Sequence, residues 1–160
     1  MIVLISIVLS LSACTTQHNV NNFYNKYQGI ENSMSFQAPL FLASLIMDNE
    51  FDAFRQKIKS VRFLTLNDLD KTEYSTVNNE IKNALSKDGF TNWFNVNDDG
   101  NNINVSAQNR GKSVRNIVIS FQGFDNLILV NAKTQLTEQE LTKFIMKFIN
   151  STEKTKSADD

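Results

Sequence analysis

The sequence predicts an α+β fold with a single mostly antiparallel sheet of about six strands and helices packed on one face. Apolar residues at helical spacing mark segments near both ends and in the middle of the chain. Between them lie segments whose apolar residues alternate or run continuously, as in strands. The last four strand segments are separated by short polar turns, which favours antiparallel hairpins.

The domain is expected to begin with a helix, a strand and a second helix. Residues 20–27 place their apolar side chains on one helical face, and Gly29 is positioned to end that helix. Residues 33–37 predict a strand. Residues 40–47 predict a helix that is apolar nearly all round, which indicates that it is buried.

A short helix and a second strand are expected next. Residues 50–58 predict the helix, and residues 60–66 predict a strand with apolar residues on both faces, which is typical of a central position. If this strand shares a sheet with residues 33–37, the two should be parallel and joined by a right-handed helical crossover.

Two capping patterns mark the starts of the two later helices. Asp70 and Glu73 resemble a capping pair, and Thr137 and Glu140 predict a capping box at the start of the last helix. Residues 151–160 are polar and are expected to be a disordered tail. The strands expected between these helices cover residues 90–96, 102–108, 114–121 and 126–133.

An uncharged apolar run, residues 1–13, leads directly to Cys14, the only cysteine of the chain. The run is shorter than the ~20 apolar residues that cross a bilayer, and it fits the apolar core of a secretory signal, although no Lys or Arg precedes it. The stretch LSAC that ends at Cys14 resembles the lipobox of bacterial lipoproteins. The resemblance implies a signal peptide cleaved before Cys14, a diacylglycerol on its thiol and an acyl chain, such as palmitate, on its amino group. Acylation also accounts for a lone cysteine in an exported protein.

Composition limits the partners and the number of domains. Residues 14–19 are expected to be a lipidated tether, and residues 20–150 form one domain that is large enough to bury a core. The 16 basic and 17 acidic residues give a net charge of −1, which argues against a nucleic-acid partner. Membrane contact is expected through the lipid on Cys14. Thr15 and Thr16 lack the acidic character of retention and surface-export signals, which favours the periplasmic face of the outer membrane.

Two turns contain partial binding motifs. The sequence NVNDDG, residues 95–100, resembles the start of an EF-hand loop, but Ser106 stands where the bidentate Glu belongs. The sequence RGKS, residues 110–113, resembles the end of a P-loop, but a strand-like segment follows it. Both are expected to be hairpin turns, the second with two solvated cations.

The domain holds no catalytic constellation that the sequence can reveal. With Cys14 acylated and His18 in the tether, the Cys–His, Ser–His–Asp and zinc-ligand sets are incomplete, so no metal or cofactor is expected. Acidic residues cluster at residues 48–52 and 68–73. They leave a carboxylate-based hydrolase or a small-ligand binder as the alternative function, although acidic residues are also favoured at helix starts.

An interaction face is expected on the side of the sheet away from the helices. Trp93 and Phe94 are neighbours in one strand and should point to opposite faces. Ile117, Ile119 and Phe121 are expected beneath the helices. The outer aromatic would either join the core beneath a helix, which is the favoured interpretation, or contact a ligand or a partner. As an exposed residue it would anchor a partner, because aromatic residues are enriched among interface hot spots. The predicted face comprises that aromatic together with Val118, Ser120 and Gln122.

The order of these parts resembles a known family. A lipobox is followed by FYNKYQGI (residues 23–30), a Met-containing strand and apolar helix, IKSVRFLTL (residues 58–66), a helix, a β-meander and a closing helix. This order resembles the small Bacteroidota lipoproteins built on domain of unknown function 4252, over residues 14 to about 150. The resemblance implies a lipid-anchored envelope protein and supplies no active-site residues. We therefore expect a non-catalytic protein-interaction or envelope-sensing module with an envelope protein as its partner.

Overall fold

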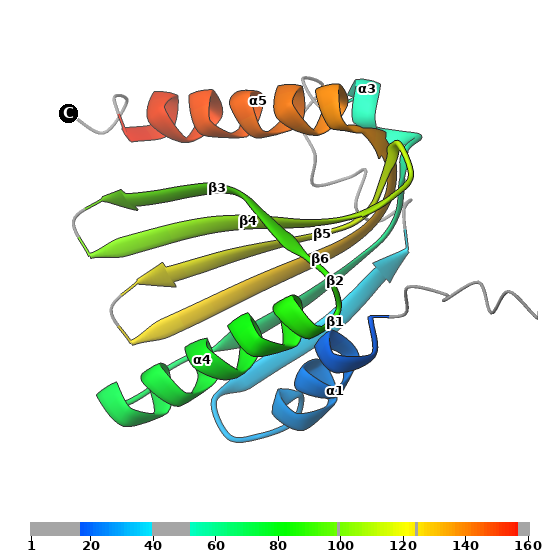
Figure 1. Ribbon diagram of the computed structural model, residues 1–160. Helices are drawn as coiled ribbons and strands as arrows, with labels where there is room; N and C mark the ends of the chain where they lie inside the picture. The colour runs from blue at the N-terminus through cyan, green and yellow to red at the C-terminus, as the bar shows by residue number, and fades with distance from the viewer. Residues whose placement is uncertain (1–16, 40–51, 99, 124, 157–160) are drawn as a thin grey trace, which may run out of the picture.

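The computed structural model describes residues 17–39, 52–98, 100–123 and 125–156, which form one six-stranded sheet with helices against it (Figure 1). In chain order the elements are α1 (His18–Tyr27), β1 (Ser33–Pro39), α3 (Asp52–Arg55), β2 (Ile58–Leu66), α4 (Lys71–Lys87), β3 (Thr91–Asp98), β4 (Asn101–Arg110), β5 (Ser113–Gly123), β6 (Asn126–Thr137) and α5 (Glu138–Lys156).

The sheet has the strand order β1-β2-β6-β5-β4-β3, and every neighbouring pair is antiparallel. Strands β3 to β6 form a meander, and β2 pairs with the free side of β6 so that β1 and β3 are the two edges. The predicted α+β class, with one antiparallel sheet, is confirmed. Gly100 and Gly111 adopt positive φ angles of 82° and 62° in the two turns that resembled binding loops, and hairpins connect the strands at both.

The predicted parallel pairing of the first two strands is wrong. Strand β1 pairs antiparallel with β2, with Ser33 opposite Leu66 and Pro39 opposite Ser60. The chain leaves β1 and enters β2 at the same end of the sheet, so no crossover connection is needed. The helix expected over residues 50–58 ends at Arg55 within α3, and Ile58 already belongs to β2. The helix expected over residues 40–47 lies outside the described residues.

The helices lie on both faces of the sheet, whereas the sequence predicted one covered face. Helices α1 and α4 pack on one face, and α5 lies over the other (Figure 1). Residues 116–120 of β5 are consecutive and all buried, which requires cover on both sides. The core is accordingly divided into two clusters, one beneath α1 and α4 and one beneath α3 and α5.

Both predicted capping boxes are present. Asp70 accepts hydrogen bonds from the backbone N–H of Thr72 and Glu73, and the Glu73 carboxylate accepts one from the backbone of Asp70. Thr137 and Glu140 exchange the corresponding bonds at the start of α5. Helix α5 then continues to Lys156, into the segment that was predicted to be a polar tail.

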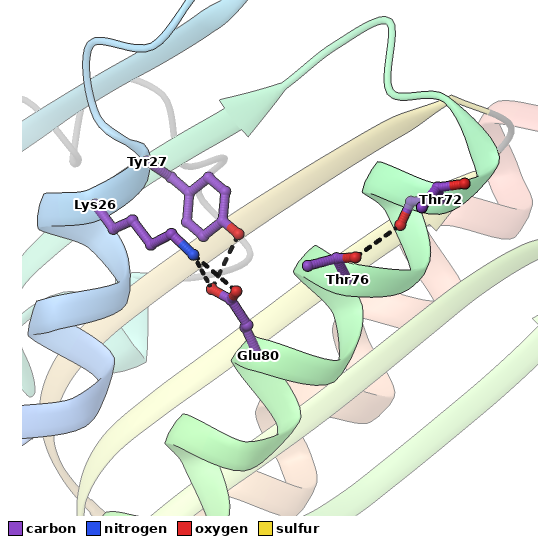
Figure 2. Close-up of polar contacts among 5 residues, drawn as sticks. All are labelled: Lys26, Tyr27, Thr72, Thr76 and Glu80. Atoms are coloured by element: carbon purple, nitrogen blue, oxygen red, sulfur yellow. Dashed lines mark hydrogen bonds and ion pairs between the residues drawn. The ribbon is translucent and has the colours of Figure 1, made fainter.

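A polar clasp joins α1 to α4 (Figure 2). Lys26 donates to both carboxylate oxygens of Glu80 at 2.7 Å, and the Tyr27 hydroxyl donates to one of them at 3.0 Å. The hydrogen bond from Lys26 holds the pKa of Glu80 below its ordinary value. One turn earlier on α4, the Thr76 hydroxyl bonds to the backbone carbonyl of Thr72 (Figure 2). The clasp fixes how the two helices lie on their shared face.

The start of α1 is held by a residue from the end of α4. Helix α1 has no side-chain cap of its own, and the carboxylate of Asp88 accepts bonds from the backbone N–H of Asn19 and Val20, at 3.1 and 2.8 Å. Asp88 is itself buried. A negative charge at a helix N-terminus satisfies unpaired N–H groups and is favoured by the helix dipole. The two helices are thereby joined at both ends of α1. Among the helices of the described ranges, none has the length and hydropathy needed to cross a membrane.

Candidate functional site

The predicted interaction face is buried. Val118 and Ser120 are only 1% and 5% exposed, and Val118 belongs to the cluster beneath α1 and α4. Gln122 bonds to α4, donating to Asn78 at 2.9 Å and accepting from the Tyr74 hydroxyl at 3.4 Å. The expectation that these three residues face solvent or a partner is therefore wrong, because α4 covers the face that was taken to be free.

Trp93 and Phe94 also depart from the prediction. Both are half-buried, and both pack against the cluster beneath α3 and α5. The pairing of β3 with β4 shifts register between Asn92 and Phe94, which places Trp93 at the irregular position. Such a bulge breaks the two-residue alternation of a strand. Neither aromatic therefore points outward on the opposite face as an anchor for a partner.

The exposed apolar surface lies instead on the α5 side of β1, β2 and β6. We call it the apolar ladder. Met34, Phe36 and Ile128 are 59%, 44% and 39% exposed, and Phe63 stacks on Phe36 with ring centroids 4.7 Å apart. Residues directly opposite in an antiparallel pair share a face, and the register gives one apolar row of Phe36, Phe63 and Val130. Met34 and Ile128 lie beside this row on the same face, with Thr65 between them. Its members are Met34, Phe36, Phe63, Ile128 and Val130.

The ladder is unusual because its large apolar side chains are neighbours. Single exposed apolar residues are common on protein surfaces, whereas contiguous apolar patches mark interaction sites. On the opposite face of β6, Leu127 and Leu129 are almost fully buried. The sequence reasoning missed the ladder, since the signal that marks it, Met34 and Phe36 alternating with polar residues in residues 33–37, was used only to predict a strand.

A basic pocket of about 270 Å³ lies at the opposite end of the strands. Lys59 and Arg115 occupy the positions at which β2 and β5 shift register, and such bulges redirect side chains. Lys133 and Arg110 add two more cations from β6 and β4. None of the described residues that line the pocket is acidic. The lining comprises Lys59, Arg110, Arg115, Asn116, Lys133, Thr134 and Gln135.

A buried polar network lies behind the pocket. Asn116 donates from its amide to the side-chain oxygen of Gln108, and Gln108 donates to the backbone carbonyl of Asp88. Asn131 donates to the side-chain oxygen of Gln17 at 2.9 Å, just before α1. These bonds satisfy side chains that would otherwise be costly to bury. They also fix the start of α1 to the strands that carry the pocket.

Several acidic side chains of the described ranges hold helix starts. Asp70 and Glu73 cap α4, and Asp88 caps α1. Glu140 accepts bonds from Lys57 and from the backbone of Thr137, and these hold its pKa at about 2. Within the described ranges, no group of three or more metal-ligating side chains converges. The carboxylates of residues 48–51, and Cys14 with its predicted lipid, lie outside them.

The lone histidine lies in α1, although the sequence placed it in the tether. His18 is the first residue of α1, exposed, with its ring 3.2 Å from the Asn22 amide. Gln17, just ahead of it, is buried.

The geometry defines the class of protein. It is an α+β domain with one antiparallel sheet, an apolar ladder and a basic pocket. The chain matches the family described as domain of unknown function (DUF4252) over residues 17–144, and it belongs to that family. The family resemblance seen in the sequence is confirmed to this extent. Comparison with curated proteins and with solved structures found no match.

Proposed function

We propose that this protein is a lipid-anchored, non-catalytic module of the cell envelope that binds another protein through its apolar ladder. The observation that carries the proposal is the exposure of Met34, Phe36 and Ile128 on one face, around the half-buried Phe63 and Val130. Exposed apolar patches with polar surroundings are typical of protein–protein contact sites. Thr65 lies opposite both Met34 and Ile128 on the same face and adds a polar side chain to this surface.

The anchor is supported by the sequence ahead of the domain. The apolar run of residues 1–13 ends directly at Cys14 in the LSAC stretch. A thioether-linked diacylglycerol together with an amide-linked acyl chain gives stable membrane attachment, whereas a single chain gives only marginal binding. On this proposal the domain faces the periplasm from the outer membrane.

The non-catalytic assignment is supported by the roles that the acidic side chains already have. Asp70, Asp88 and Glu140 each hold a helix start through backbone hydrogen bonds. The basic pocket is lined by cations, amides and a threonine, which does not suit a pair of catalytic carboxylates.

The partner-binding part is tested by crosslinking in the native envelope followed by purification of the protein. A variant with Met34→Ser, Phe36→Ser and Ile128→Ser should lose a crosslinked species that the wild type forms. A matched control, Ile30→Ser with Met146→Ser, removes exposed apolar side chains elsewhere, since these residues are 43% and 54% exposed. Equal crosslinking of the ladder variant and the control would reject the ladder as the contact surface.

The anchor is tested separately with Cys14→Ser. The protein should leave the membrane fraction or accumulate unprocessed, and mass spectrometry of the wild type should show an acylated Cys14 as the first residue. A Cys14→Ser protein that stays processed and equally membrane-bound would contradict the anchor while leaving the ladder experiment valid.

A further inference from the structure

The basic pocket lies at the point where the chain enters the domain. Gln17, just ahead of α1, is bonded to Asn131 of β6. Asn131 and Lys133 lie on the same face of β6, because alternate residues of a strand share a face. Two residues along a strand separate them by about 7 Å. Figure 1 shows the start of α1 at the end of the sheet where β6 passes into α5.

The predicted lipid attachment site is close to this end in the sequence. Cys14 precedes Gln17 by only three residues, and a fully extended chain of that length spans about 10 Å. A lipid on Cys14 would therefore hold the bilayer surface within reach of the pocket. This geometric step rests on the anchor of the proposed function and is independent of the ladder.

The charge of the pocket is local. The whole chain has a net charge of −1, yet four cations meet at this one site. No ion pair joins any of the four to a carboxylate of the described ranges, in contrast with the pairs Lys26–Glu80 and Lys57–Glu140. The Glu138 carboxylate accepts a hydrogen bond at 2.7 Å from the amide of Asn109, which precedes Arg110 of the pocket. The positive charge of the pocket is therefore available to an anion.

We propose that this pocket binds the phosphate group of an anionic phospholipid in the membrane that holds the Cys14 lipid. Arginine presents planar donors that match phosphate oxygens, and lysine adds a compact positive charge. Arg110 and Arg115 supply the first kind of contact, and Lys59 and Lys133 the second. The lipid anchor supplies proximity, and the pocket fixes which end of the sheet faces the bilayer.

The test uses the protein purified from its native membrane and placed in vesicles. One set contains phosphatidylcholine alone, and the other an equimolar mixture of phosphatidylcholine and phosphatidylglycerol. Limited acetylation followed by mass spectrometry measures the reactivity of individual lysines. Lys59 and Lys133 should react roughly fivefold more slowly in the anionic vesicles, which corresponds to about 1 kcal/mol for a basic side chain at such a surface. Lys71, at the far end of α4, should react equally in both.

Two variants decide whether the pocket is responsible. Arg110→Gln with Arg115→Gln should abolish the protection of Lys59 and Lys133. Lys82→Gln with Lys143→Gln removes the same charge from exposed positions on α4 and α5 and should leave the protection intact. Equal acetylation in the two vesicle types, or protection that survives in the arginine variant, would overturn the proposal.

Further arms separate the pocket from the anchor and from free phosphate. If millimolar inorganic phosphate protects the two lysines equally in detergent, the site takes a free anion and the lipid assignment is wrong. If the protein is found without acyl chains, the anchor fails. The pocket is then still tested by short-chain phosphatidylglycerol against short-chain phosphatidylcholine, with the same lysines as the readout.

Discussion

The two faces of the sheet are built from the same strands and differ in how completely they are closed. On the face beneath α1 and α4, Leu64, Leu127 and Leu129 are at most 1% exposed. On the other face, α5 covers Val114, Ile117 and Leu136, while the apolar ladder stays open at the distant end of β1, β2 and β6. The difference shows that an apolar strand face is not by itself a buried face, because the covering helices decide which part becomes core.

The sharpest test of this comparison uses two neighbours in β6. Leu129→Ala removes a fully buried side chain and should lower the free energy of unfolding by about 2–5 kcal/mol. Ile128→Ala, on the ladder, should lower it by about 1 kcal/mol or less. Urea denaturation of both variants measures the difference. Similar losses would mean that the ladder is as well packed as the closed face.

The stability of the face beneath α1 and α4, the closed face, depends on how the start of α1 is held. Substitution of Asp88 tests this. Asp88→Ala leaves the N–H groups of Asn19 and Val20 without their acceptor, and it should cost roughly 2 kcal/mol. Denaturant melts report the loss, and hydrogen exchange at the start of α1 should report local opening. Asp88→Asn, which keeps one acceptor oxygen, should fall between the wild type and the Ala variant. An Ala variant as stable as the wild type would show that α1 is held by its apolar face alone.

One buried polar atom on the closed face lacks a hydrogen-bond partner, and a substitution should remove it. The Tyr24 hydroxyl is buried without a hydrogen-bond partner, and burial raises its pKa strongly. Tyr24→Phe removes an unsatisfied polar atom and keeps the ring that lies 4.4 Å from the Arg62 guanidinium. The variant should gain about 1 kcal/mol in the free energy of unfolding, seen as a higher thermal midpoint. A loss of stability instead would indicate that the hydroxyl has a partner in solution.

The smallest effect is expected at the start of α5, which belongs to the open face. Bonds from Lys57 and Thr137 lower the pKa of Glu140 from 4.5 to about 2. A depressed folded-state pKa means that the carboxylate stabilises the fold above about pH 4.5, and that this contribution is lost as the pH falls toward 2. Glu140→Gln should therefore be slightly less stable than the wild type at neutral pH, and the difference should shrink as the pH falls from about 4.5 through 2. A difference that does not change with pH would contradict this assignment.

Local signals in the sequence predicted most of the elements, and long-range pairing accounts for what they missed. The capping boxes at Asp70 and Thr137 and the turns at Gly100 and Gly111 depend on neighbouring residues, and all four are confirmed. The orientation of β1 and the side of the sheet on which α5 lies depend on contacts between distant segments, which periodicity does not report.

The candidate sites illustrate the same limit. Lys59 and Arg115 meet in one pocket only because the register of β2 and β5 shifts at those positions. Phe36 and Phe63 stack because β1 pairs antiparallel with β2, which the sequence prediction had reversed. The register shift near Trp93 removed the aromatic anchor that strand alternation had predicted. The sequence shows which residue types are present, but it does not show which residues become neighbours in the fold.

The separation of the ladder and the pocket along β6 bears on how far the ladder can lie from the membrane. Ile128 of the ladder and Lys133 of the pocket are five residues apart on this strand, which corresponds to about 17 Å. If the pocket rests on lipid headgroups and β6 stands upright, the ladder would lie about that far above the bilayer surface, beyond the ~8 Å over which surface charge acts at physiological salt. A partner on the ladder would then be selected by the shape and apolar character of the ladder, with little influence from the charge of the membrane.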